Sequence, residues 1–351
     1  MKIAVVSNMY PDEKHPSYGV FVKNFCNILD DINIDYKLHV MLKADSPIEK
    51  MLRYAKFYIG TTIALLFEKY DLIYVHYASH SSLPVLWARR IRKKQIYTNV
   101  HGSDVIPENS KQERLQKYTG RILSISEKII TPSEYFRKLV GYKYEIGEDK
   151  IFVSPSGGIN NKVFYKEREK VNDGCLKLGY VGRISHKKGW DTLLNACSHL
   201  DIPYELIVVG NGPEYRDMYL LANKLNINNN IRWIDLQPQE KLRELYNIMD
   251  VFVFPTEREG ESLGLVALEA MACGTPVIAS DYAAPKYYVE NNKNGYKYSC
   301  GDSSDLKNKI EYFYRLDEDT RRELGKNAEI TARNYDYDRR QNEIRMILDL
   351  Q

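Results

Sequence analysis

The chain has 351 residues, a length that predicts two domains rather than one. Its composition, 44% hydrophobic and 28% charged, is that of an ordinary globular protein, and its net charge of +3 is too small to indicate nucleic-acid binding. Residues 1–150 carry 23 Lys and Arg against 17 Asp and Glu, whereas residues 151–351 carry 27 against 30. The first half is therefore the better candidate for contact with an anionic partner.

The cysteines and the N-terminus bear on the compartment. Five cysteines without a C-x-x-C pair favour free thiols in a reducing environment. Met1–Ser7 predicts a first strand and lacks the layout of a signal peptide. The uncharged apolar run Phe57–Phe67 is shorter than the roughly 18–20 residues that span a bilayer, and no other uncharged run reaches that length. We expect a cytoplasmic protein. Peripheral contact with the inner face of the membrane is a further possibility.

Short apolar runs alternate with longer amphipathic runs along the chain, and this pattern occurs twice. In the first half, strands are predicted near 2–7, 36–42, 71–77, 95–100, 128–132 and 150–154, with helices such as 20–30, 48–68 and 83–92. In the second half, strands are predicted near 176–181, 204–209, 231–235, 251–255 and 276–280, with helices near 190–200, 214–226, 239–249 and 264–273. Such alternation predicts an α/β fold with parallel sheets and helices on both faces.

The polar, aperiodic stretch 159–174 is interpreted as a linker between the two halves. We expect domains at 1–165 and 166–334, with a last helix, about 335–351, that packs back on the first domain. Two doubly wound domains that face one another leave a cleft at the carboxyl ends of their strands, where ligands of such sheets bind.

The segment 257–280 places two carboxylates around a predicted helix start. Glu261 lies in the loop before Gly264, and Glu269 lies about two turns into the helix that Gly274 ends. The unsatisfied N–H groups of a helix start form an anion site, so a diphosphate is expected there, with carboxylates that suit sugar hydroxyls. The alternative is a solvated loop glutamate followed by a glutamate on an exposed helix face.

A second cluster lies in LGYVGRISHKKGWDTLL, where Arg183 and Lys188 flank a turn between a strand and a helix. Two cations there would neutralise a diphosphate leaving group. Lys187 competes with Lys188, and a solvated basic loop is the alternative.

In the first half, Gly19 precedes a helix and could let the backbone approach a phosphate. His101 follows a strand and could act at a reacting centre, while Asp104 could orient its loop. His76 and His80 stand four residues apart without an evident third ligand, so we expect no metal.

The basic run Arg89–Lys94 follows the aromatic and aliphatic segment Tyr54–Phe67. Together they suit an anionic membrane surface or a lipid-phosphate acceptor. A solvated helix end beside a core helix is the alternative.

Three motifs together resemble family 4 of the retaining glycosyltransferases. They are His101-Gly102-Ser103-Asp104, Arg183-x4-Lys188-Gly189, and Glu261-x7-Glu269 followed by residues 270–279. Along the chain they occur in the same order as in that family. The resemblance extends from Gly19 to the last helix. It implies the GT-B fold, two Rossmann-like domains facing across a cleft, with the nucleotide-sugar held mainly by the second. It also implies retention of anomeric configuration and no metal cofactor.

The resemblance further implies roles for individual residues. Glu261 would contact the donor sugar hydroxyls and Glu269 the nucleotide ribose. The diphosphate would be held by Arg183 and Lys188, while Ser262, Leu263, Gly264 and Leu265 would supply backbone donors and shape beside it. His101 would lie near the donor sugar, and Gly19 near the phosphates.

We therefore expect a glycosyltransferase that moves a sugar from a nucleotide-diphosphate donor to a hydroxyl of a glycan or lipid-linked glycan acceptor, in surface polysaccharide biosynthesis. Neither a nucleic acid nor a further cofactor is expected. One alternative is a catalytically idle nucleotide-sugar-binding protein. A glycoside hydrolase is a less suitable alternative. Such an enzyme places its two carboxylates across one bond, about 5–9.5 Å apart, and Arg183 and Lys188 would have no role in it. A dinucleotide dehydrogenase would use Gly210-x-Gly212, but position 215 is Tyr rather than Gly or Ala.

Overall fold

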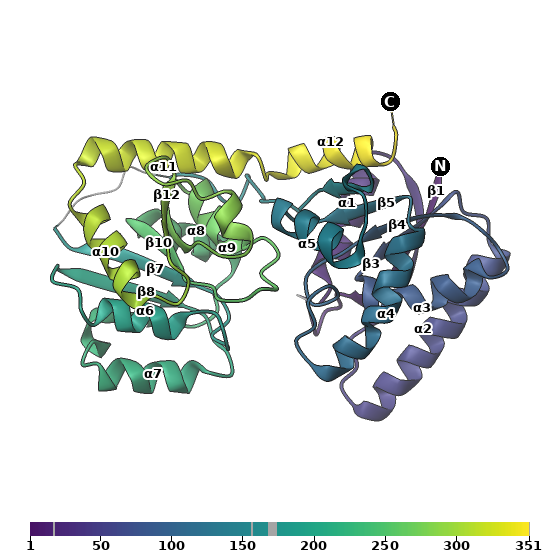
Figure 1. Cartoon of the computed structure of the whole chain (residues 1–351), viewed down its shortest axis with the longest axis horizontal. Helices are drawn as coiled ribbons and strands as arrows, with labels where there is room; N and C mark the ends of the chain where they lie inside the picture. The colour runs from purple at the N-terminus through teal and green to yellow at the C-terminus, as the bar shows by residue number, and fades with distance from the viewer. Residues whose placement is uncertain (17, 156, 168–173, 351) are drawn as a thin grey trace. The chain divides into compact units, whose positions relative to one another are not determined.

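The computed structural model describes residues 1–16, 18–155, 157–167 and 174–350. The chain divides into two compact units: Met1–Gly157 with Asp338–Gln351, and Gly158–Tyr337. Each unit contains one six-stranded sheet (Figure 1). All strand pairs in both sheets are parallel, so the predicted α/β class with two Rossmann-like domains is confirmed.

The sheet of the first unit has the strand order β2-β1-β3-β4-β5-β6. Its strands are β1 (Lys2–Tyr10), β2 (Asp35–Leu42), β3 (Leu72–His76), β4 (Gln95–Asn99), β5 (Lys128–Thr131) and β6 (Ile151–Val153). Its helices are α1 (Val20–Asp31), α2 (Pro47–Phe67), α3 (Ala78–Arg89), α4 (Ser110–Ile125), α5 (Glu134–Tyr144) and the 3-10 turn η1 (Glu148–Lys150).

The sheet of the second unit has the strand order β12-β11-β10-β7-β8-β9. Its strands are β7 (Leu176–Val181), β8 (Tyr204–Val209), β9 (Ile231–Ile234), β10 (Val251–Phe254), β11 (Val277–Ser280) and β12 (Gly295–Tyr298). Its helices are α6 (Trp190–Cys197), α7 (Tyr215–Lys224), α8 (Gln239–Ile248), α9 (Leu265–Ala272), α10 (Ser303–Tyr314) and α11 (Glu318–Arg333), with η2 (Asn228–Asn230) and η3 (Ala284–Tyr287).

Alternate residues of a strand point to opposite faces of its sheet, and both faces of the second sheet are covered. Leu206 and Val208 of β8 belong to one buried cluster, whereas Ile207 and Val209 belong to the other. Strands buried on both sides read as continuous apolar runs, which is why this sequence predicts them so clearly.

The last helix, α12 (Tyr337–Ile347), returns to the first unit. Lys128 Nζ donates to the carbonyl oxygen of Ile347 at 2.7 Å, and Gln341 Nε2 donates to Asp31 at 2.7 Å. The units divide between Gly157 and Gly158, earlier than the expected boundary at 165/166, because Ile159 and Phe164 are buried in the core of the second unit. The first part of the expected linker 159–174 is therefore packed structure, and its residues 168–173 lie outside the described part of the chain.

Two elements differ from the sequence prediction. Strand β12 was not predicted, because Gly295–Tyr298 has the sequence Gly-Tyr-Lys-Tyr rather than a continuous apolar run. Helix α3 begins at Ala78 rather than near 83, because the Asp104 carboxylate accepts the Ala78 N–H at 2.9 Å and so stabilises the start of the helix. Along the described residues, none of the helices combines the length and apolar character needed to cross a membrane.

Candidate active site

Most predicted site residues of the second unit lie on loops at one edge of its sheet. Arg183 and Lys188 lie between β7 and α6, and Glu261 lies between β10 and α9. Strand β7 pairs with both β8 and β10. Because the strands are parallel, the loops that follow them meet at the carboxyl edge of the sheet, where ligands of doubly wound folds bind.

Two glycines allow these loops to lie in contact. Gly189 precedes α6 with a φ of 69°, and a Cβ there would lie 1.8 Å from the carbonyl oxygen of Pro255. Gly264 precedes α9 with a φ of 79°, and a Cβ there would lie 2.5 Å from the ring of Phe254. Any other residue at either position would have a strained backbone and would clash with these neighbours.

Lys188 and Glu261 form an ion pair in this edge. Lys188 Nζ lies 2.6 Å from Glu261 Oε2, and the side chains are only 17% and 11% exposed. The Thr256 hydroxyl donates to the same carboxylate oxygen at 3.2 Å. The neighbouring Lys187 is exposed, and its backbone φ is 59°. The contact therefore distinguishes Lys188 from Lys187, which sequence spacing could not do.

Helix α9 begins beside this ion pair and presents the four residues predicted to surround a diphosphate. The first N–H groups of a helix lack intrahelical acceptors and attract anions. Leu263 is buried, so its side chain anchors the loop and only its backbone can meet a ligand. Ser262 is partly exposed, Gly264 caps the helix and Leu265 is exposed. The structure thus places Ser262, Leu263, Gly264 and Leu265 together at the helix start.

Glu269 lies on the second turn of α9 and is partly buried. Burial raises the pKa of its carboxyl group to about 7, although the Tyr246 hydroxyl, which donates to Oε2 at 3.1 Å, acts in the opposite direction. One hydrogen bond does not replace the hydration that the carboxylate has lost. A ligand with adjacent hydroxyl groups would supply the missing donors.

A pocket of about 500 Å³ lies at the ends of β7 and β8. The pocket is lined by Arg183, Leu236, Gln237, Leu242 and Val266 and by the loops at Gly182 and Gly210–Gly212. At Gly212 a Cβ would lie 2.1 Å from the carbonyl oxygen of Ile184, so this glycine brings two loops together. In the sequence, Gly210 and Gly212 indicate only a possible dinucleotide motif, and this pocket was not predicted.

In the first unit, His101 follows β4 and contacts a second histidine. Its Nε2 lies 3.1 Å from Nδ1 of His76, the last residue of β3, and its ring stacks on Phe21 at a centroid distance of 3.8 Å. Burial lowers the pKa of His76 to about 3. Burial, and to a smaller extent the electrostatic interaction with His76, also holds the pKa of His101 well below its ordinary value. Both rings are neutral near pH 7, so one imidazole donates to the other.

His76 was not predicted to take part in this site. It is fully buried, and within the described residues its Nε2 has no hydrogen-bond partner. Its contact with His101 fixes the orientation of the His101 ring. No sequence signal pairs the two, because adjacent parallel strands bring them together from positions 25 residues apart.

Asp104 holds the loop that carries His101. Its carboxylate is fully buried and accepts the backbone N–H groups of Ala78, His101 and Gly102 at 2.9, 3.0 and 2.8 Å. Three backbone donors on one carboxylate fix the loop between β4 and α4 against the start of α3. The geometry gives Asp104 an orienting role rather than direct contact with a ligand.

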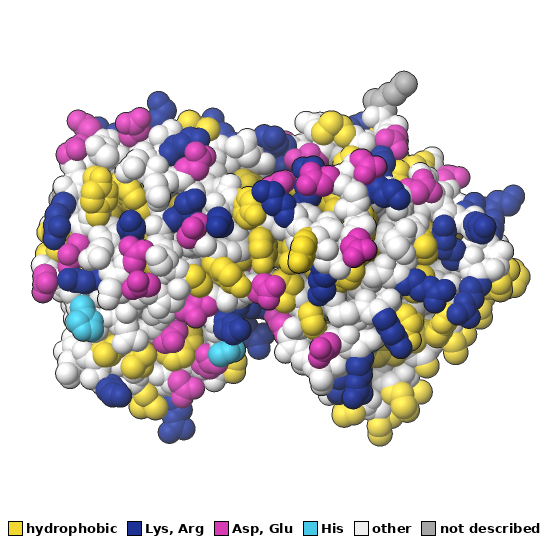
Figure 2. All heavy atoms as spheres, viewed as in Figure 1, with side chains coloured by type: hydrophobic (Ala, Val, Ile, Leu, Met, Phe, Trp, Pro, Cys, Tyr) yellow, Lys and Arg dark blue, Asp and Glu magenta, His cyan; other side chains and the backbone are white. Residues whose placement is uncertain are grey.

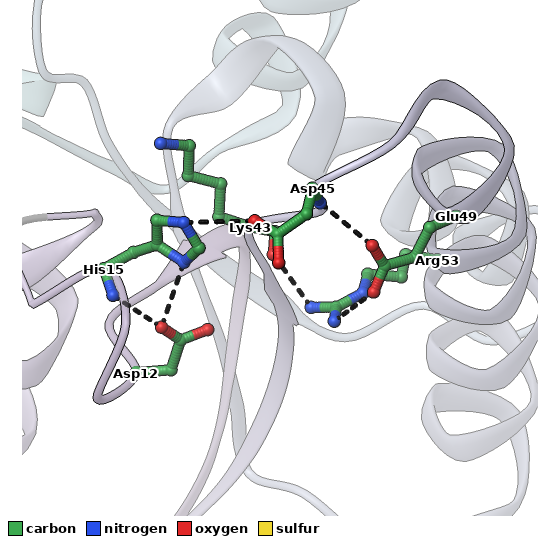
Figure 3. A network of polar contacts seen from close by, with 6 residues as sticks. All are labelled: Asp12, His15, Lys43, Asp45, Glu49 and Arg53. Atoms are coloured by element: carbon green, nitrogen blue, oxygen red, sulfur yellow. Dashed lines mark hydrogen bonds and ion pairs between the residues drawn. The ribbon is translucent and has the colours of Figure 1, made fainter.

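Gly19 lies before α1 with a φ of 74°, and a Cβ there would lie 2.6 Å from the carbonyl carbon of Met9. Close packing against β1 is sufficient to explain this glycine without a ligand. The loop that precedes it is tied to the start of α2 (Figure 3). The His15 ring lies 3.1 Å from Asp12 and 3.2 Å from Asp45.

His76 and His80 point to different partners. His76 contacts His101, whereas His80 Nδ1 lies 2.8 Å from the Tyr58 hydroxyl. Among the residues that the structure describes, no group of three or more His, Cys, Asp or Glu side chains could hold a metal ion. Independence from metal stays a prediction.

Comparison with known proteins assigns both units. Residues 161–331 match the family Glycosyl transferases group 1, and residues 17–157 match Glycosyltransferase Family 4. The chain is a glycosyltransferase of the GT-B type. Both matches follow the division of the chain into two units, and the carboxyl-edge residues of the second unit lie within the first match.

Relatives and solved structures agree with this assignment. An uncharacterized glycosyltransferase of Methanocaldococcus jannaschii is 28% identical over 279 residues, covering 78% of this chain and 73% of that protein. N-acetyl-alpha-D-glucosaminyl L-malate synthase of Bacillus anthracis is 22% identical over 278 residues, covering 74% and 69%. The fold is similar to that of sucrose-phosphate synthase from Thermosynechococcus elongatus, with a TM-score of 0.79 at 19% identity, over 99% and 98% of the two chains. HepE of Anabaena, solved with UDP, gives a TM-score of 0.76 at 17% identity over 99% and 100%.

Proposed function

We propose that this glycosyltransferase moves a sugar from a nucleotide-diphosphate donor to a hydroxyl of a glycan or lipid-linked glycan, with retention of anomeric configuration. The observation that carries the proposal is the Lys188–Glu261 pair beside the start of α9, next to the pocket that Arg183 lines. This arrangement offers cations and N–H donors to a diphosphate, and a carboxylate to sugar hydroxyls.

In the proposed reaction, the bond between the anomeric carbon and the phosphate oxygen breaks while the acceptor oxygen bonds to the same carbon. Arg183, Lys188 and the N–H groups of α9 stabilise the negative charge that develops on the leaving diphosphate. The proton of the acceptor hydroxyl passes to the leaving phosphate oxygen, so a front-face displacement needs no protein nucleophile. We propose that His101, positioned by His76 and Asp104, serves the same transfer from the first unit.

The cationic side chains take the role that a metal ion would otherwise have, so no metal is required in this proposal. Activity should therefore survive complete chelation of divalent cations. A full loss of activity that Mg²⁺ restores would contradict this part of the proposal.

The acceptor is proposed to be a lipid-linked glycan of a surface polysaccharide, by analogy with the family. Such an acceptor requires work at a membrane surface, and we propose that the first unit makes a peripheral contact with it. HepE, solved with UDP and with UDP-glucose, supports beginning a donor screen with UDP-sugars.

The test is turnover of a panel of UDP-, GDP- and ADP-sugars by the wild type and by Glu261→Ala and Arg183→Ala. We expect each variant to lose at least about 100-fold in rate, since removing one group that stabilises transition-state charge has that effect. Arg315→Ala, at an exposed arginine directly after α10, is the matched control and should leave the rate unchanged. Unchanged rates in both site variants would reject the proposed site.

A further inference from the structure

Helix α2 carries apolar side chains on the face that it turns away from its own unit. It packs on the core through Phe57, Thr61 and Leu65. Six large apolar side chains on the same helix are 51–80% exposed, and we refer to them as the α2 face: Ile48, Met51, Leu52, Ile59, Ile63 and Phe67. At about 100° per residue, four of them fall within about 60° of one another, opposite the buried residues. A helix on a soluble surface normally presents polar residues there.

The end of α3 extends this apolar surface. Arg92 Nη1 donates to the carbonyl oxygens of Leu66 and Glu68, both at 2.9 Å, and so holds the turn after α3 against the end of α2. Trp87 and Ile91 on this segment are also exposed. Figure 2 shows hydrophobic and basic side chains together over the region that α2 and α3 occupy in Figure 1.

The charges around the α2 face are mainly positive. Five exposed cations lie on α2, at its end and on the turn after α3: Lys50, Lys56, Lys69, Arg90 and Lys93. The nearby carboxylates are already paired. Glu49 lies 2.5 Å from Arg53 (Figure 3), and Glu68 lies 2.7 Å from Lys37. An apolar face with a basic rim complements a surface that is apolar inside and anionic at its boundary.

We propose that the α2 face, with Trp87 and Ile91, docks on a bilayer that contains anionic phospholipids. The apolar side chains enter the boundary between headgroups and acyl chains, and the lysines and Arg90 contact lipid phosphates. Because Phe57, Thr61 and Leu65 keep α2 attached to the core, the helix lies along the membrane surface. The inference draws on the proposed function only for its lipid-linked acceptor, and lipid binding is measured without turnover.

The test is co-sedimentation of the full chain with vesicles of phosphatidylcholine, with or without one third phosphatidylglycerol. We expect binding to the anionic vesicles that weakens with added salt and with loss of phosphatidylglycerol. Ile59→Glu/Ile63→Glu should lower the partition coefficient at least about ten-fold. Lys56→Gln/Lys93→Gln should lower it about 25-fold, since each basic residue near an anionic surface contributes about five-fold.

Leu220→Glu/Ile330→Glu is the matched control, because these residues are 53% and 50% exposed on the second unit and should leave binding unchanged. Absence of wild-type binding, equal binding to both vesicle types, or unchanged binding of Ile59→Glu/Ile63→Glu would each overturn the inference. Self-association without lipid that this variant abolishes would also overturn it and assign the face to a second copy. Transfer to a water-soluble acceptor should be the same in this variant and the wild type, so a failure of docking is distinguishable from a failure of the proposed transfer.

Discussion

The Lys188–Glu261 pair allows the arrangement of the carboxyl edge to be tested through stability alone. Glu261→Gln removes the anion and leaves the Lys188 ammonium beside an amide, in a place where its side chain is only 17% exposed. Lys188→Met is the milder change, because the Thr256 hydroxyl still donates to Glu261. The double variant Glu261→Gln/Lys188→Met removes both charges together.

Breaking a buried ion pair from one side costs about 3–5 kcal/mol, and the remaining exposure of both side chains reduces the expected cost of Glu261→Gln to about 2 kcal/mol. For a unit of this size that cost lowers the Tm by about 4–8 °C. The double variant should lose at least about 1 kcal/mol less free energy of unfolding than the sum of the losses in the two single variants. The assay is a double-mutant cycle of thermal and urea unfolding, with Glu259→Gln, an exposed carboxylate in the same loop, as the control.

If the stability losses of the two single variants add up to that of the double variant within about 0.3–0.5 kcal/mol, Lys188 and Glu261 behave as independent sites and the expected coupling is absent. A loss of stability in Glu259→Gln as large as that in Glu261→Gln would also contradict the prediction, because exposed substitutions ordinarily change stability by less than about 0.5 kcal/mol. Either result would mean that the pair does not hold the loop before α9.

Three further predictions concern single residues. The folded-state pKa of Glu269 is raised from 4.5 to about 7, so the folded carboxyl retains its proton over a range in which the unfolded one has lost it, and stability falls as pH rises through that range. Glu269→Gln should therefore match the wild-type Tm near pH 4. By pH 8 its free energy of unfolding should exceed that of the wild type by up to about 3 kcal/mol. A stability difference between the two proteins that stays constant across this pH range would contradict the prediction. His76→Phe keeps an aromatic ring but removes the contact with His101. It should lower kcat about ten-fold and leave the donor affinity, measured by calorimetry, unchanged. An unchanged kcat would mean that His76 does not position His101. Gly189→Ala should lower the free energy of unfolding in urea by more than about 3 kcal/mol. Gly174→Ala is the comparison, because Gly174 has a similar φ of 83° but open space around it, and it should lower this free energy by about 1 kcal/mol. Equal losses would show that backbone strain alone governs both.

The repeated alternation of strands and helices could be predicted from the sequence, because the central strands are buried on both faces and appear as continuous apolar runs. Strand β12 was missed because its residues, Gly-Tyr-Lys-Tyr, do not form a continuous apolar run. The start of α3 was misplaced because it depends on Asp104, a residue 26 positions away. Long-range capping of this kind leaves no local pattern.

The candidate site was predictable where residue types and spacing coincide with a helix start, as at Glu261, Gly264 and Glu269. It was not predictable where a contact decides between neighbours. Only the structure distinguishes Lys188 from Lys187 and pairs His76 with His101.

Pocket residues such as Leu236 and Gln237 lie after β9 and have no chemical signature. Their place in the site follows from the strand order, because β8 lies between β7 and β9.

The central claim is that the second unit activates a nucleotide-diphosphate sugar for transfer to an acceptor. The most direct measurement is the stoichiometry of nucleoside diphosphate released and acceptor glycosylated, with the anomeric configuration of the product determined by NMR. We predict one released diphosphate for each new glycosidic bond, retention of configuration, and no product with Glu261→Ala. Release of free sugar without acceptor would indicate a hydrolase, and donor binding without any release would indicate an idle binding protein; either result would contradict the claim.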